Sequence, residues 1–350
     1  MPSTNPKTYT TTPSRKVAFL GLGVMGYPMA GHLALAGHEV TVYNRSAAKA
    51  AAWCVEFAAT TAPQSAATPR QAVAGADIVF CCVSNDDDLR SVTLGEDLGN
   101  GKRADQGALA GMKAGAVLVD HTTASANVAR ELSGHAKALG LQFVDAPVSG
   151  GQAGAQNGML TVMCGGEQAA FEAASPLAMA FARAFTLLGA SGAGQLAKMV
   201  NQICIAGLVQ GLSEAIAFGA RAGLDMPQVL DVIGKGAAQS WQLDNRGKTM
   251  VADKFDFGFA VDWMRKDLGL VLAEAQTMGV PVVAVGAEGT LGSVEVGVSA
   301  DEGATAGGGV GVLVASAAGA AFGTSNWIAT MIAIPAVASA QDWVPGTEIV

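Results

Sequence analysis

The amino-acid sequence predicts an α/β protein in which an N-terminal doubly wound domain is joined by a long helix to an all-α C-terminal domain. Two observations carry this prediction. Short apolar runs alternate with alanine-rich helical segments over residues 15–190, a pattern typical of a mainly parallel sheet. From Gln195 to about Arg221 the apolar residues keep helical spacing without proline, which suits a helix that links two domains.

The first predicted strand, Lys16–Leu20, is followed directly by a glycine pattern of the form GxGxxG and then by a helix that runs to about Ala36. In such a turn the first glycine permits a tight bend, and the second lets the backbone approach a pyrophosphate. The third lets the helix pack closely on the sheet. The sequence therefore predicts a Rossmann-type dinucleotide site with cofactor contacts from Gly21, Leu22, Gly23, Val24, Met25 and Gly26.

The remaining elements follow in chain order. The second predicted strand is Glu39–Tyr43, and Gly95–Gly115 reads as a surface loop. Two further helices are predicted after the linking helix, at Asp225–Ile233 and Asp267–Met278. The later strands are predicted from short apolar runs at Ile78–Val83, Val117–Val119, Gln142–Val144, Leu160–Cys164 and Phe185–Leu188.

These elements divide the chain into four segments. Residues 1–14, rich in Ser, Thr and Pro, read as a disordered leader, and residues 15–190 form the dinucleotide-binding domain. Residues 191–284 form a helical domain for substrate and oligomerisation. Residues 285–350 are an atypical glycine-rich tail, and no Lys or Arg follows Lys266. This change suggests a reading-frame shift, and a lineage-specific tail is the alternative.

Composition argues against several classes of partner. The formal net charge is −8 and the isoelectric point is near 5.0, without a basic stripe for nucleic acid or for an anionic membrane. No apolar run gives a clear membrane span. The five cysteines contain no CxxC pair, so neither disulfides nor a metal site is predicted. We therefore expect a cytoplasmic protein that binds neither nucleic acid nor a membrane.

The second strand ends in Asn44-Arg45-Ser46, at the distance from Gly21 where a Rossmann-type domain reaches the adenosine ribose. An acidic residue there would hydrogen-bond both ribose hydroxyls of NAD(H), and none is present. A guanidinium matches the geometry of a 2′-phosphate. Asn44, Arg45 and Ser46 therefore favour NADP(H) over NAD(H).

Two further clusters carry chemistry. Ser149-Gly150-Gly151 follows a predicted strand and presents a hydroxyl and unshielded backbone N–H groups, which suit a carboxylate. In the linking helix, Lys198 and Gln202 share one face, with Asn201 beside them. Lys198 lies in an apolar stretch, where burial lowers the pKa of an amine toward the range useful for proton transfer.

Four ordered motifs between about Lys16 and Pro281 resemble the β-hydroxyacid dehydrogenase family. It includes 3-hydroxyisobutyrate dehydrogenase and the tartronate, glyoxylate and succinic semialdehyde reductases. The motifs are Phe19–Ala30, Asp145–Gly151, Gly192–Gln202 and Gly258–Leu268. The resemblance implies that Lys198 is the general acid/base, that Ser149, Gly150 and Gly151 hold the substrate carboxylate, and that Asn201 and Gln202 orient the substrate. It also implies cofactor contacts from Val83, Ser84, Asn85, Thr122, Thr123 and Lys266.

The function implied is hydride transfer between a nicotinamide and a small β-hydroxyacid or aldehyde acid, without a metal, in a homodimer or homotetramer. Two alternatives remain open. Imine reductases share the fold but commonly have Asp or Tyr where this chain has Lys198. A non-catalytic NADP-binding scaffold would bind cofactor without turnover, and the presence of Lys198 beside an intact Ser149-Gly150-Gly151 argues against it.

Overall fold

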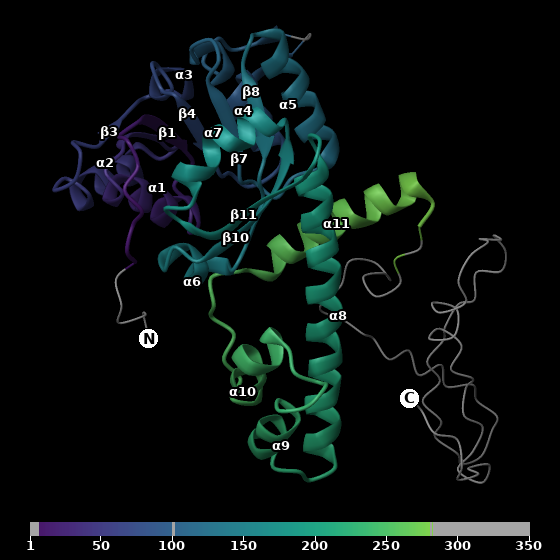
Figure 1. Cartoon of the computed structure of the whole chain (residues 1–350). Helices are drawn as coiled ribbons and strands as arrows, with labels where there is room; N and C mark the ends of the chain where they lie inside the picture. The colour runs from purple at the N-terminus through teal and green to yellow at the C-terminus, as the bar shows by residue number, and fades with distance from the viewer. Residues whose placement is uncertain (1–6, 100–101, 281, 283–350) are drawn as a thin grey trace. The chain divides into compact units, whose positions relative to one another are not determined.

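The structure is a computed structural model that describes residues 7–99, 102–280 and 282 (Figure 1). The predicted glycine-rich tail, 285–350, and the first six residues of the predicted leader lie outside the described residues.

One sheet of nine strands forms the centre of the first domain in the part of the chain that the structure describes. The strand order β3-β2-β1-β4-β7-β8 is parallel throughout, β10 pairs antiparallel with β8, and β11 pairs parallel with β10. The strands are β1 (Lys16–Leu20), β2 (Glu39–Tyr43), β3 (Gln64–Ser65), β4 (Ile78–Cys81), β7 (Val117–Asp120), β8 (Gln142–Asp145), β9 (Val148–Ser149), β10 (Leu160–Gly166) and β11 (Ala182–Gly189). This order confirms the doubly wound prediction and places the topological switch point between β1 and β4, where such folds bind ligands.

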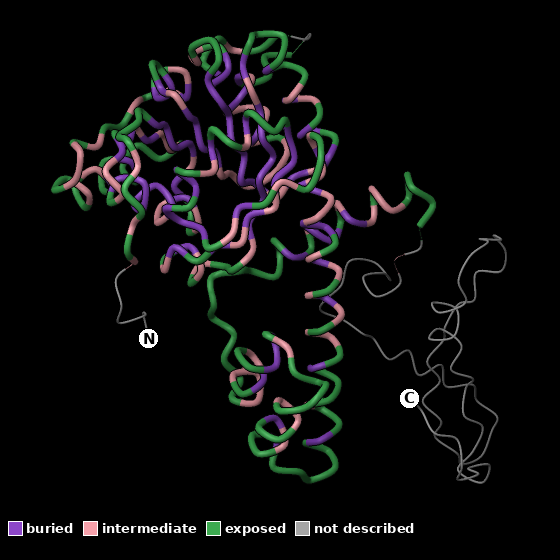
Figure 2. Tube along the Cα trace, viewed as in Figure 1, coloured by how far each residue is buried: buried purple, intermediate pink, exposed green. Residues whose placement is uncertain are grey.

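Helices cover both faces of this sheet, because neighbouring strand residues point to opposite sides. In β1, Phe19 belongs to the core beneath α1 (Gly26–Leu35), α2 (Ala47–Glu56) and α7 (Gln168–Ala178). Leu20 belongs to the core on the other side, beneath α3 (Pro69–Ala72), α4 (Asp86–Leu94) and α5 (Ala126–Ala138). Figure 2 shows the buried residues concentrated in the sheet and in the helix faces that cover it.

The second domain consists of helices. They are α8 (Ala193–Arg221), α9 (Met226–Ile233), a π-helical turn (Leu243–Gly247), α10 (Lys248–Val251) and α11 (Val261–Met278). The predicted linking helix and the predicted helix ending at Ile233 are confirmed. The last helix begins at Val261 and not at Asp267, so Lys266 lies on a helix and not in the segment before it.

The helical domain has a small hydrophobic core. Two small clusters hold it together, one around Ala206 and Leu268 and the other around Leu212 and Leu230. Figure 2 draws these helices mainly in the colours of exposed and intermediate residues, with few buried ones. Large apolar side chains such as Phe218, which is 76% exposed, lie on the surface.

Helix α8 is long and apolar enough to cross a membrane by length and composition, with a mean hydropathy of 1.6 over 18 residues, and 17% of that stretch is buried. It is the one such helix among the described residues. A helix that a soluble protein covers passes the same test.

Some short elements differ from the prediction. The segment predicted as a surface loop contains an antiparallel hairpin of β5 (Asp97–Gly99) and β6 (Lys102–Arg103), followed by a 3₁₀ turn at Leu109–Gly111. The short helix α6 (Gly151–Gln156) and the strands β3 and β9 were not predicted either. The unpredicted strands have two or three residues and α6 has six, which is too short for a strand run or a helical period to be recognised.

Residues 7–14, predicted as part of a disordered leader, lie against the first domain. The Lys7 ammonium donates to the backbone carbonyls of Gly158, Met179 and Ala182. The Tyr9 hydroxyl lies 2.7 Å from Nδ1 of His32, on α1. The polar composition of this segment gave no sign of these partners, because the carbonyls come from residues distant in sequence.

Candidate functional site

The glycine-rich turn after β1 has the shape that a dinucleotide needs. Gly21 has φ of +96°, and a Cβ there would lie 2.3 Å from the Cys82 carbonyl oxygen. A Cβ on Gly26 would lie 2.0 Å from the Gly21 carbonyl oxygen. A Cβ on Gly23, in contrast, would meet no heavy atom within 4 Å. Gly21 and Gly26 are thus required for the turn itself, while the space beside Gly23 is open for a ligand, as a pyrophosphate site requires.

The end of β2 supports this turn and reaches beyond it. Asn44 accepts a hydrogen bond from the Leu22 backbone N–H through Oδ1, at 2.9 Å, and donates to the Ser46 carbonyl, at 3.2 Å. Arg45 is 90% exposed in its side chain, with Nη1 3.6 Å from Oδ1 of Asp88. A solvent-exposed ion pair of this kind contributes little free energy to folding. The Arg45 guanidinium is therefore available to a phosphate, and Asn44 holds the turn in place.

The predicted cofactor residues that follow β4 and β7 meet at the same edge of the sheet. The Val83 backbone N–H donates to Oγ1 of Thr122, at 3.0 Å, which joins the two strand ends. Asn85 begins α4 by accepting a hydrogen bond from the Asp88 N–H.

Lys266 reaches this edge from α11. Its ammonium donates to the Ser84 carbonyl, at 3.1 Å, and to the Thr123 carbonyl. The structure therefore brings a lysine from the helical domain onto the segments that follow β4 and β7, two neighbouring strands at this edge of the sheet.

The predicted carboxylate loop lies beside α8. Gly150 and Gly151 have φ of +128° and +60°, values that side chains with a Cβ disfavour. Ser149 donates from Oγ to Oδ1 of Asn201, at 3.3 Å. The segment before α11 packs here as well, because a Cβ on Gly258 would lie 1.9 Å from Oε1 of Gln152. The loop, α8 and the approach to α11 thus come together around Ser149.

Lys198 is buried in α8, with 7% of the residue exposed. Burial lowers the pKa of its ammonium from the ordinary value of 10.5 to about 8, while the nearby carboxylate of Asp267 raises this pKa and the charge of Lys266 lowers it. The prediction that an apolar surrounding depresses this pKa is thus supported. An amine with this pKa is present in both protonation states near neutral pH, as an acid/base group requires.

Asp267 was missed by the sequence reasoning. It is 3% exposed, and its Oδ2 accepts a hydrogen bond of 2.6 Å from Nε2 of Gln202. Its Oδ1 lies 3.1 Å from Nζ of Lys266. Gln202 in turn accepts from Nδ2 of Asn201, at 2.8 Å. A hydrogen-bonded chain therefore runs from Ser149 through Asn201 and Gln202 to Asp267. The signal available was the position of Asp267 directly after Lys266 in the last motif.

Asp145 begins the second motif and was given no role. Its carboxylate accepts from the backbone N–H groups of Gly192, at 2.7 Å, and Gln195, at 3.1 Å. Burial raises the pKa of Asp145 to about 6, and these N–H groups oppose that rise. Asp145 therefore anchors the start of α8 to the end of β8.

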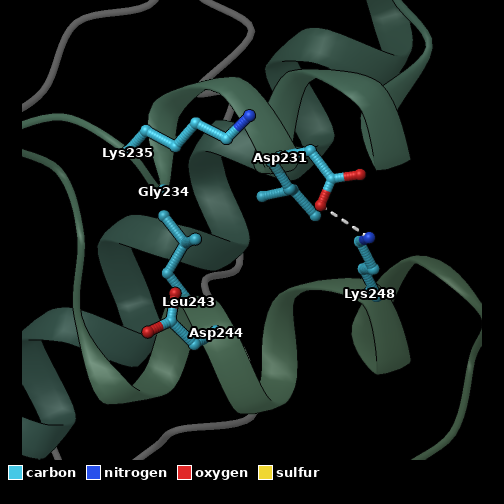
Figure 3. A pocket seen from close by; sticks show the side chains of 7 residues that line it. Asp231, Gly234, Lys235, Leu243, Asp244 and Lys248 are labelled. Carbon is cyan, nitrogen blue, oxygen red and sulfur yellow. Dashed lines mark ion pairs between the residues drawn. The ribbon is translucent and has the colours of Figure 1, made fainter.

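A pocket of about 230 Å³ lies elsewhere, in the helical domain (Figure 3). The described residues that line it include none of the predicted site. Lys248 pairs with Asp231 at 2.6 Å across it, and both side chains are more than half exposed. Its lining residues are Leu230, Asp231, Gly234, Lys235, Leu243, Asp244 and Lys248. This pocket lies apart from the residues predicted for the cofactor and the substrate, so the candidate site is the edge of the sheet with the open glycine turn, together with the buried Lys198 on α8.

Comparison with known proteins gives matches over both domains. Residues 16–189 match the model of the NAD binding domain of 6-phosphogluconate dehydrogenase. Residues 192–306 match the model described as NAD-binding of NADP-dependent 3-hydroxyisobutyrate dehydrogenase. The second match runs past Pro281, where the sequence motifs end.

Individual proteins agree with these models. An uncharacterized oxidoreductase of Shewanella frigidimarina is 58% identical over 77% of this chain and 89% of its own length. The 2-hydroxy-3-oxopropionate reductase of Escherichia coli is 34% identical over 75% of this chain and 85% of its own. A crystal structure of 3-hydroxyisobutyrate dehydrogenase from Salmonella typhimurium aligns with a TM-score of 0.65 and 30% identity, over 77% of this chain and 89% of the other.

The matches cover both domains, and the order of strands and helices is the one that the motifs imply. The two family models describe NAD(P)-binding domains, and relatives are named as dehydrogenases or reductases of small hydroxy acids. The chain therefore belongs to the β-hydroxyacid dehydrogenase family of NAD(P)-dependent oxidoreductases.

Proposed function

We propose that this protein is an NADPH-dependent reductase of small aldehyde acids, or in reverse a 3-hydroxyacid dehydrogenase, with Lys198 as general acid/base. The observation that carries the proposal is the buried Lys198 amine, with a pKa of about 8, on the same face of α8 as Gln202 and about one helical turn before Asn201, which accepts a hydrogen bond from Ser149. Lysine side chains are rarely buried unless they have a functional or pairing role, because moving a charged amine out of water costs free energy.

The cofactor site would be formed by residues of both domains. The residues Gly21–Gly26 would receive the pyrophosphate, and Lys266 would close over the cofactor from α11, next to Val83–Asn85 and Thr122–Thr123. A bound nicotinamide would supply or accept the hydride. The exposed Arg45 and the lack of an acidic residue at the end of β2 favour NADP(H). The description of the second family model as NADP-dependent agrees with that preference.

The substrate would be held by its carboxylate. Gly150 and Gly151 leave their backbone N–H groups unshielded, and the Ser149 hydroxyl, which donates to Asn201 in this structure, would turn to the carboxylate as a further donor. Asn201 and Gln202 are tied to this loop and to Asp267, so their amides are fixed before substrate binds. Such preorganisation is what orienting groups contribute to a reaction.

Lys198 would move the proton. In reduction its ammonium donates a hydrogen bond to the carbonyl oxygen and then protonates the developing alkoxide. In oxidation the neutral amine takes the proton from the alcohol. Because the pKa of Lys198 is about 8, neither direction is blocked near neutral pH.

We also propose that the protein works in the cytoplasm as a homodimer or homotetramer. Val200, Leu208 and Phe218 on α8 are 61%, 48% and 76% exposed in the single chain. Large apolar side chains exposed along a helix are a surface that another subunit can cover, and they support the proposal of association. Light scattering after size exclusion measures the mass directly, and a monomer at micromolar concentration would contradict this part of the proposal.

The test of activity is a panel of carbonyl acids assayed with NADPH and with NADH. Glyoxylate, succinic semialdehyde and tartronate semialdehyde are the first members. We expect turnover with NADPH, and we expect Lys198→Ala to abolish it while NADPH binding stays nearly intact. An imine reductase would act on cyclic imines instead, and a scaffold would bind NADPH without any turnover. Substantial turnover by Lys198→Ala would refute the assignment.

A further inference from the structure

Gln195 is fully buried in the first turn of α8, on the same side of the helix as Lys198. Both the oxygen and the nitrogen of its side-chain amide are hydrogen-bonded. Oε1 accepts from the Ala124 backbone N–H at 3.0 Å, and Nε2 donates to the Thr122 carbonyl at 2.8 Å. The amide thus binds the backbone on both sides of Thr123 as a neighbouring strand would. Only a side chain with a donor and an acceptor in this arrangement can do so.

Gln195 binds the backbone of residues 122–124. This segment is also contacted by the other elements of the candidate site. Thr122 accepts from the Val83 N–H, and Thr123 accepts from Lys266. The backbone N–H of Gln195 itself donates to Asp145. Gln195 therefore connects α8 to the end of β7 and, together with Gly192, to the end of β8. Through residues 122–124 it is also linked to the segment after β4 and to α11.

We propose that Gln195 is a positioning residue, which fixes the first turn of α8 to residues 122–124 and so holds the Lys198 amine at its buried place in the site. This inference rests on the proposed function only for its effect on turnover. The role is one of placement, because Gln195 touches backbone groups and not the Lys198 amine.

Two substitutions separate this role from simple packing. Gln195→Met has a similar shape but neither hydrogen-bonding group, so Thr122 and Ala124 lose both partners. Gln195→Glu keeps the shape. When ionised, its carboxylate faces the Thr122 carbonyl without a proton, and when protonated it again offers a donor and an acceptor. Gln210→Met is the matched control, because Gln210 lies on the exposed face of the same helix and pairs with Glu214.

The first experiment needs no substrate. The Lys198 amine is titrated by competitive acetylation at a series of pH values with peptide mass spectrometry, and hydrogen exchange is followed in the peptide that contains Ala124. We expect a midpoint near 8 in the wild type and in Gln210→Met. In Gln195→Met we expect an upward shift of about one unit as water reaches the amine, with faster exchange at Ala124. An unchanged midpoint or unchanged exchange in a folded Gln195→Met would overturn the inference.

The second experiment uses Gln195→Glu, and it decides the matter if Gln195→Met does not fold. Titratable groups surround this junction on every side. They are Asp120 and Asp145 at the strand ends, Cys81 and His121 beside Thr122, Asp86 on α4, Lys198 on α8, and Lys266 and Asp267 on α11. At each pH the turnover of the variant is therefore divided by that of the wild type. The titration of these other groups affects both proteins and cancels in the ratio. We expect a loss of at least about tenfold at pH 9, worth one hydrogen bond, that recovers toward pH 6. A ratio that stays flat across this range would overturn the inference.

These outcomes are separable from a failure of the proposed function. If the wild type turns over a carbonyl acid and Lys198→Ala does not, while both Gln195 variants match the wild type, only the Gln195 inference fails. If the wild type turns over none of the carbonyl acids, the proposed function fails. The labelling and exchange measurements then still decide the position of Lys198.

Discussion

Two glycines of the same turn should respond oppositely to alanine. Gly26→Ala places a Cβ 2.0 Å from the Gly21 carbonyl oxygen and 2.9 Å from the Phe19 ring. The obstructing atom is backbone, so the turn must move, and we expect a loss of about 1–3 kcal/mol in the free energy of unfolding. Gly23→Ala places a Cβ in open space, at a residue without positive φ. There we expect unchanged or slightly higher stability, because alanine restricts the unfolded chain by about 0.4–1 kcal/mol.

For cofactor affinity we expect the opposite order, with Gly23→Ala as the variant that is impaired. The space beside Gly23 is where the pyrophosphate backbone should pass, so the added methyl group displaces it. A steric cost of about 1–3 kcal/mol corresponds to an affinity for NADPH that is about 5-fold to 150-fold weaker. Thermal unfolding measures the first quantity and titration of NADPH fluorescence the second. The reasoning is refuted if Gly23→Ala binds NADPH as tightly as the wild type, or if Gly26→Ala unfolds at the wild-type temperature.

Four further variants test other parts of the site. Asp267→Asn removes the charge that raises the pKa of Lys198, so the rising limb of the pH profile for alcohol oxidation should move to lower pH by about one unit; a profile that moves upward would contradict the arrangement. Arg45→Ala should raise KM for NADPH about tenfold and leave KM for NADH unchanged, which steady-state assays with both cofactors measure. Ser149→Ala should raise KM for the carbonyl acid more than it lowers kcat, and an effect on kcat alone would remove Ser149 from the carboxylate site. Lys198→Met should stabilise the fold below pH 8, because the native amine has a lower pKa than the unfolded one; the gain is about 3 kcal/mol in urea unfolding at pH 7, declines between pH 8 and 10.5, and should be absent above it.

The turn from β1 to α1 could be predicted from the sequence because its evidence is local. A buried strand, three glycines at fixed spacing and an apolar helix all lie within twenty residues of one another, and each has its own physical reason. The burial of Lys198 could also be predicted, since the residues around it in α8 are apolar. The start of α11 could not, because Val261–Lys266 mixes charged and aromatic residues without a clear apolar period.

Asp267 and Gln195 show why part of the site escaped the sequence. Each is a buried polar residue whose partners come from distant elements: Gln202 on α8 for Asp267, and the backbone after β7 for Gln195. A single sequence shows that these residues are polar but not that they are buried. Their hydrogen bonds become visible only once the sheet edge and the two helices have been placed together.

The role of Lys198 is tested most directly by chemical rescue. Lys198→Ala removes the amine and leaves a cavity in a buried place that a small primary amine can enter. Turnover of the best carbonyl acid is measured with NADPH in increasing ethylamine, with Gln210→Met as the control. The account predicts a loss of about 10²–10⁴ in kcat without ethylamine and a recovery that rises with its concentration. Turnover near the wild-type rate in Lys198→Ala without any added amine would contradict it.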